Sequence, residues 1–203
     1  MTAEARPHMA PAQPDGSPWP VPPENGYSLD DLYTLDLPPH TQLIDGSLVF
    51  VSPQRKFHTL VMFLLETCLR ASVPAHLRVR REMAVVLGPR NVPEPDLIVV
   101  DAEADADQDQ TRYKAEDVVL AIEVVSPESE SRDRETKPHK YARAGIPYFW
   151  LVERGGPDQR PLVRTYELDK LTRTYVPTGI HRDRLKVDVP YPISVDLTEI
   201  DRM

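Results

Sequence analysis

The sequence predicts an α/β (α+β) fold, in which a mixed central sheet with β-hairpins is flanked by helices. Two aliphatic runs, 97–100 and 118–122, are typical of strands that are covered on both faces. One long segment, 56–72, carries apolar residues at helical spacing. Strand patterns outnumber helical ones and do not alternate regularly with them, which argues against a Rossmann-type order.

The chain has 203 residues, and we expect one domain over 27–203 behind a disordered tail over 1–26. The tail holds seven prolines and few aliphatic residues, a composition that cannot build a core. No segment approaches the ~20 apolar residues of a membrane span, so we expect no membrane contact. Because Cys68 is the only cysteine, we expect a reducing cytoplasm.

The first predicted elements follow the tail. Ser28 and Asp31 resemble a capping box that opens a short helix ending near Asp36. The Asp45-Gly46 pair lies between two apolar runs and predicts a hairpin. Further on we expect a helix over 56–72, strands over 76–80, 82–88, 95–101, 118–126 and 147–153, a helix ending near Gly145, and a closing hairpin over 162–176.

Glu123 stands in the apolar run 118–126, where an ionised side chain costs several kcal/mol unless a partner receives it. Asp96 precedes the neighbouring buried run, so the two acids converge if these strands are adjacent. A hard divalent cation is the simplest way to keep both ionised. The alternative is a purely structural carboxylate that receives backbone N–H groups or one of the three nearby arginines, Arg78, Arg80 and Arg81.

Lys137 lies near the start of a predicted helix. If Thr136 caps that helix, the lysine is placed against the helix dipole, which indicates an anionic neighbour. Alternatively, Asp133 and Lys137 form a favourable surface pair at i, i+4. Both interpretations remain open from the sequence.

The motifs PEPD, AIEVVSPES and RDRETKPHKYARAGIPYFWLVE together resemble the bacterial Uma-two family of the PD-(D/E)XK, restriction-endonuclease-like superfamily. The resemblance covers about residues 27–178. It implies a metal-dependent phosphodiesterase site in which Asp96 and Glu123 match the two motif acids. The superfamily lysine two residues after the second acid is absent, since Val125 stands there, and Lys137 takes the place that the family gives its lysine.

The family's first hairpin begins with glutamate, but this chain has Gln42 there. An amide oxygen can still ligate a cation, without contributing charge. His58 matches a histidine common in the family's long helix, and either a packing or a catalytic role fits it.

These observations lead to the hypothesis of a Mg²⁺- (or Mn²⁺-) dependent endonuclease, acting on DNA in preference to RNA. Asp96, Glu123 and the backbone carbonyl of Val124 would hold the ion, with Gln42 as an auxiliary ligand. Lys137 would orient or deprotonate the attacking water, or neutralise charge on the phosphate. The resemblance also suggests a homodimer.

The rival hypothesis is a catalytically inactive nuclease-fold module that binds nucleic acid or protein. It is favoured by Gln42 and by the net charge of -8, which opposes non-specific attraction to nucleic acid.

Overall fold

The structure is a computed structural model that describes residues 21–105 and 107–203. Most of the predicted tail, 1–26, lies outside the described residues. A six-stranded sheet forms the centre, in the order β10-β9-β8-β7-β5-β3. Its strands are β3 (Leu77–Arg81), β5 (Leu97–Asp101), β7 (Val118–Val124), β8 (Tyr148–Gly155), β9 (Arg160–Asp169) and β10 (Thr174–His181).

The sheet is mixed, as the sequence predicts. Strand β7 pairs with β8 in parallel, and every other neighbouring pair in the sheet is antiparallel. The parallel pair is joined through helix α3 (Lys137–Ala144), because a parallel connection must cross from one end of the sheet to the other. Strand β7 is buried along nearly its whole length, which explains its unbroken aliphatic sequence.

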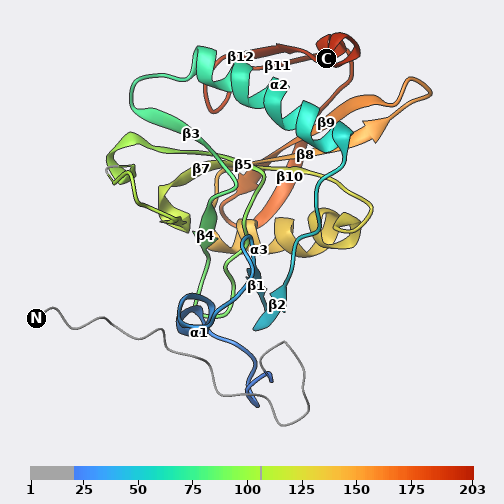
Figure 1. The fold of residues 1–203 in the computed structure, drawn as a ribbon. Coiled ribbons are helices and arrows are strands. Elements are labelled where there is room, and N and C mark those ends of the chain that lie inside the picture. The colour runs from blue at the N-terminus through green and yellow to red at the C-terminus, as the bar shows by residue number, and fades with distance from the viewer. Residues whose placement is uncertain (1–20, 106) are drawn as a thin grey trace, which may run out of the picture.

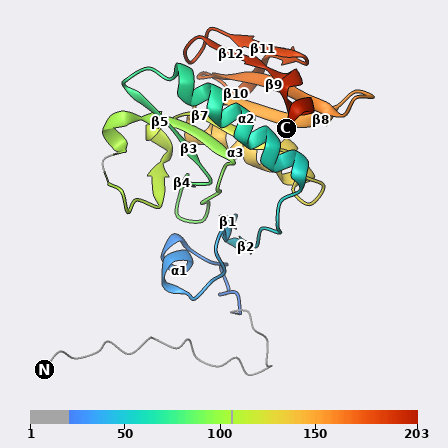
Figure 2. The ribbon, with the colours of Figure 1, turned by 45° about the horizontal axis from the view of Figure 1, so that its top comes forward.

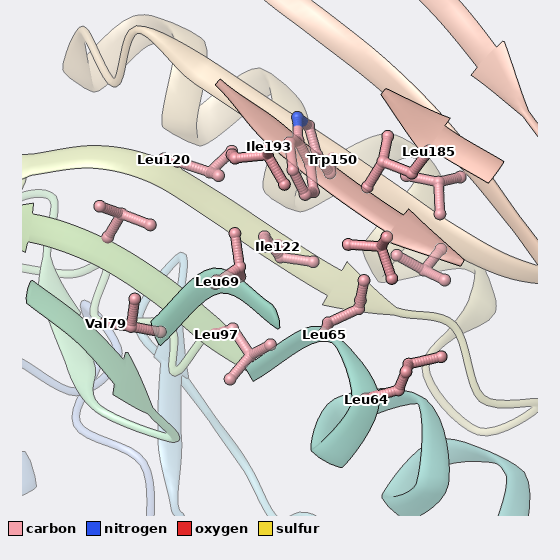
Figure 3. Close-up of a cluster of buried hydrophobic side chains, with 14 of the residues drawn as sticks. Leu64, Leu65, Leu69, Val79, Leu97, Leu120, Ile122, Trp150, Leu185 and Ile193 are labelled. Atoms are coloured by element: carbon pink, nitrogen blue, oxygen red, sulfur yellow. The ribbon is translucent and has the colours of Figure 1, made fainter. Parts of the chain in front are cut away.

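Helices lie on both sides of the sheet (Figure 1), and a cluster of buried hydrophobic side chains fills the space on each face. On one face lies α2 (Lys56–Ser72), together with the hairpin of β11 (Arg184–Val187) and β12 (Ile193–Asp196) and the 3₁₀ segment Leu197–Arg202. Figure 3 shows this layer, in which Leu65 and Leu69 of α2 lie near Ile122 and Trp150 of the sheet. Helix α3 covers the opposite face with Tyr141.

The N-terminal elements lie to one side of the sandwich (Figure 2). Helix α1 (Leu29–Thr34) has the predicted capping box between Ser28 and Asp31. The predicted hairpin is present as β1 (Gln42–Ile44) and β2 (Ser47–Val49), with its turn at Asp45-Gly46. None of the described helices is long and apolar enough to cross a membrane.

Four features differ from the sequence prediction. The expected strand at 82–88 is shorter, β4 (Ala84–Val86), and pairs in parallel with β6 (Arg112–Lys114) outside the central sheet. The β11–β12 hairpin was not predicted, nor were the 3₁₀ turns Ala102–Ala104 and Ala115–Asp117. The proposed cap at Thr136 is wrong, because a π-helical segment, Arg132–Thr136, leads into α3 without a break in helical backbone.

Candidate active site

A cavity of about 560 Å³ lies where β7 ends and the π-helical segment begins. Its walls come from the β1–β2 hairpin and the loop after it, the start of α2, the residues before β5, the end of β7, and the segment leading into α3. The structure brings all five sequence-predicted site residues to this cavity: Gln42, Asp96, Glu123, Val124 and Lys137.

Strand pairing explains how the two acids meet. Strands β5 and β7 are antiparallel neighbours, with Leu97 opposite Ile122. Continuing this register by one residue places Asp96 opposite Glu123, a spacing at which side chains on one face contact each other. Asp96 Oδ2 accepts a hydrogen bond of 2.6 Å from the backbone N–H of Val124, which fixes the aspartate against the end of β7.

Glu123 is 1% exposed, and its two oxygens have different partners. Lys137 Nζ lies 2.8 Å from Oε2, and the hydroxyl of Tyr141 donates to Oε1 over 2.5 Å. Both partners come from α3, one helical turn apart, so their side chains lie on the same face of the helix. The arginine alternative is therefore wrong for Glu123, since the three arginines bind elsewhere: Arg80 to Asp105, Arg81 to Glu66, and Arg78 to backbone carbonyls.

Lys137 also contacts Asp133, with Nζ 3.1 Å from Oδ1. The two side chains have the predicted i, i+4 spacing, but both are buried, so the interpretation as a surface pair is wrong. Ser129 donates a hydrogen bond to the other oxygen of Asp133. One ammonium group thus joins a carboxylate of the sheet to a carboxylate of the π-helical segment.

The pKa values of the buried cluster reflect burial first and the surplus of acids over bases second. Burial raises the pKa of Glu123 to about 8, and although Lys137 opposes the shift, Asp133 and Asp96 reinforce it. Burial alone would lower the pKa of Lys137, but the carboxylates of Glu123, Asp133 and Asp96 raise it above its usual value. A further positive charge at this position would therefore be stabilised.

His58 lies on the first turn of α2 and is buried. Its Nε2 is 3.1 Å from Asp96 Oδ1, whereas its Nδ1 has no hydrogen-bond partner among the described residues. The imidazole therefore does more than pack at the start of the helix, because it fixes the second oxygen of Asp96. The two contacts of Asp96, with His58 and with the Val124 backbone, define the orientation of its carboxylate.

The residues of the cavity fit a hard divalent cation. Gln42 Oε1 is buried and has no hydrogen-bond partner among the described residues, which leaves an acceptor that a cation could use. No three His, Cys, Asp or Glu side chains within 21–105 and 107–203 are arranged to hold an ion together. The candidate donor set is therefore the carboxylates of Asp96 and Glu123 with neutral oxygens, an all-oxygen set that suits Mg²⁺ or Mn²⁺.

Sequence reasoning missed three side chains of the site. Tyr141 could have been found, because it follows Lys137 by one helical turn. Ser129 and the exposed His40, which contacts the half-buried Glu94 on the cavity wall, carry no comparable local signal. His40 and Glu94 are 54 residues apart in the chain and meet only through the tertiary fold.

A mixed sheet between two covering layers, with two acids at adjacent strand ends and a lysine on the next helix, is the arrangement that the resemblance to restriction-endonuclease-like nucleases implies. The Uma2 family model, described as "Putative restriction endonuclease", matches residues 29–198, and the chain belongs to this family. This confirms the resemblance that the motifs carried.

A solved structure supports the fold assignment. The chain is similar to the crystal structure of a protein from Anabaena variabilis, described as "a putative nuclease belonging to DUF820". The TM-score is 0.61 at 16% sequence identity, and the match covers 80% of this chain and 89% of the other. The comparison with curated proteins gave no match.

Proposed function

We propose that this protein is a Mg²⁺- or Mn²⁺-dependent endonuclease that hydrolyses phosphodiester bonds, with DNA as the preferred substrate. The observation that carries the proposal is the meeting of Asp96 and Glu123 at one cavity beside a buried lysine. The salt bridge of Lys137 joins Glu123 to Asp133 and does not include Asp96, so it does not by itself account for the second acid at the cavity. Two carboxylates that line the same cavity can share a divalent cation, and membership in a nuclease family makes a phosphodiester the expected substrate.

Asp96 and Glu123 would hold the ion, with Gln42 Oε1 and the backbone carbonyl of Val124 as neutral ligands. When bound, the ion would polarise the scissile phosphate and lower the pKa of the attacking water. Each carboxylate oxygen has two lone pairs, so Glu123 can serve the ion while keeping its contacts to Lys137 and Tyr141.

Lys137 has a more restricted role than the sequence indicated. Because two carboxylates contact its ammonium group, the lysine is held in its charged form and is a donor only. It can orient a water molecule or stabilise charge that develops on the phosphate, but it is poorly suited to act as the base. Tyr141 and His58 are positioning residues that fix the two acids.

Metal binding is the first test. Calorimetry with Mn²⁺ or Mg²⁺ should give a binding signal for the wild type and none for Glu123→Gln or Asp96→Asn. Glu103→Gln, a change at an exposed residue outside the cavity, should bind as the wild type does. If the wild type gives no signal with either ion, the proposed endonuclease activity is contradicted.

Cleavage is the second test. Wild-type protein should cut plasmid, single-stranded DNA or RNA only when the divalent ion is present, and the preferred substrate should be DNA. Lys137→Met should lose this activity while Glu103→Gln keeps it. Circular dichroism should verify that Lys137→Met is folded. If this folded variant cleaves as the wild type does, Lys137 takes no part in the mechanism.

The alternative function is an inactive module that binds nucleic acid or protein. Two observations favour it: Lys137 already pairs with Glu123, and Gln42 is an amide that adds no negative charge to attract a cation. This module would bind an oligonucleotide or a protein with no response to divalent ions. Binding without metal uptake or cleavage would select it over the enzyme.

We further propose that the protein is a homodimer and works in the cytoplasm. Strand β10 lies at one edge of the central sheet and exposes Val176 and Ile180, with Leu171 in the turn before it. Apolar side chains on an open sheet edge favour pairing with another chain. Light scattering should give the mass of a dimer for the wild type and of a monomer for the double variant Val176→Glu, Ile180→Glu.

A further inference from the structure

The cavity wall is rich in acids, which raises the question of how an anionic substrate could enter. Among the residues that the structure describes, six carboxylates line the cavity, but only two lysine or arginine side chains do, Arg132 and Lys137. These acids would repel a phosphate group. To bind there, the phosphate needs hydrogen-bond donors and positive charges on the protein. Arg132 and Lys137 are therefore the candidates for a charged contact with the substrate.

The two basic side chains differ in what they already bind. Lys137 is buried and contacts two carboxylates, Glu123 and Asp133. Arg132 is half-buried, and its guanidinium donates to a neutral partner, the backbone carbonyl of Glu128, over 3.1 Å. No carboxylate of the described residues lies within ion-pairing distance of Arg132. Its charge is therefore available to a ligand.

The π-helical segment places Arg132 and Lys137 on the same cavity. The N–H of Lys137 donates to the carbonyl of Arg132, five residues earlier, so one wide turn separates the two residues. In a regular α-helix, residues five apart point in directions that differ by about 140°. The wider π turn reduces this difference, and both side chains line the same wall.

We infer that Arg132 binds a phosphate of the nucleic-acid backbone at the entrance of the cavity, an inference that rests on the proposed nuclease function. A guanidinium can donate two parallel hydrogen bonds to one phosphate, which neither the buried Lys137 nor a backbone amide can do. Arg132 is thus a substrate-binding residue, distinct from the residues that hold the ion.

The test compares Arg132→Gln, Arg132→Lys and a control, Arg143→Gln, in steady-state cleavage of a labelled DNA oligonucleotide with Mg²⁺. Arg143 is exposed on the same helix-forming stretch, lines no part of this cavity, and loses the same charge. We expect Arg132→Gln to raise KM about ten- to a hundredfold with a smaller change in kcat. We also expect it to reduce the slope of log KM against log salt by about one. The KM of Arg132→Lys should lie between the KM values of Arg132→Gln and the wild type.

The outcomes separate the inference from the proposed function. If the wild type cleaves the oligonucleotide but Arg132→Gln and Arg143→Gln have equal KM values, Arg132 is not the phosphate contact, and the proposed function stands. If the wild type cleaves nothing with Mg²⁺ or Mn²⁺, the proposed function fails and the inference fails with it. Thermal unfolding of each variant checks that the substitution leaves the fold intact.

Discussion

Glu123 shows at the scale of one residue how a buried acid is accommodated. Its carboxylate lies in a strand whose neighbouring side chains are apolar, and two donors of α3 satisfy its oxygens. The sequence identified the residue because a single acid interrupted an aliphatic run. It could not identify the donors with certainty, since a lysine and a tyrosine on the next helix become partners only when that helix packs on the sheet.

The raised pKa of Glu123 gives a prediction for stability against pH. Its folded-state pKa, about 8, exceeds the ordinary value of 4.5, so the native state binds this proton more tightly than the unfolded chain does. The contribution to the free energy of unfolding is therefore present below pH 4.5 and is lost as pH rises toward 8. Because a tenfold difference in proton affinity corresponds to about 1.4 kcal/mol, the total loss is on the order of a few kcal/mol.

Glu123→Gln should remove this dependence, because an amide does not titrate in this range. Urea unfolding at several pH values, without divalent ions, should show a shallower fall in the free energy of unfolding for this variant than for the wild type. The control Glu103→Gln should follow the wild-type curve. Parallel curves for the wild type and Glu123→Gln would contradict the raised pKa.

At the scale of elements, the sequence predicted well the helices and strands whose bounds depend on local sequence. It did not predict those whose bounds depend on tertiary contacts. The 56–72 helix and the Asp45-Gly46 hairpin agree with the structure, because amphipathic spacing and turn chemistry are local. The π-helical segment was not predicted, and Thr136 is not the cap that one of the two interpretations of Lys137 assumed. Lys137 is held by Glu123 of another element, and no local pattern shows that the helix must widen there.

Gly145 ends α3 and provides a prediction at this scale. Its φ of 92° is left-handed, and an added Cβ would lie 2.9 Å from an Arg173 guanidinium nitrogen. Gly145→Ala should lower the free energy of unfolding by about 1 kcal/mol, because only glycine adopts this conformation at low cost. Gly88→Ala is the matched control, since its Cβ would meet nothing within 4 Å. Equal stability of the two variants in urea would contradict the account of the helix end.

At the scale of the whole molecule, two hydrophobic layers pack against opposite faces of the same sheet. Leu65 of α2 is fully buried in one layer, and Tyr141 of α3 in the other, with β7 contributing side chains to both. The sequence predicted this sandwich from its buried strands. It did not predict the β11–β12 hairpin or the β4–β6 pair, because short strands at the periphery take their partners from the finished fold.

The shared sheet predicts that the two layers unfold together. Leu65→Ala should lower the free energy of unfolding by about 2–5 kcal/mol, through lost burial and the cavity it leaves. Tryptophan fluorescence and far-UV circular dichroism should report the same shifted urea midpoint. Leu171→Ala, at a side chain that is 92% exposed, should change stability by less than about 0.5 kcal/mol. Separate midpoints from the two probes would contradict a single cooperative unit.

The contacts among Glu123, Lys137 and Tyr141 also bear on how this protein can evolve. Removing one member of a buried ion pair costs about 3–5 kcal/mol, a large share of the margin by which a domain stays folded. A lineage could therefore not discard these residues one at a time, whatever activity it keeps. Its descendants should either keep all three residues or carry apolar residues of similar volume at all three positions. The three positions should therefore change together or not at all.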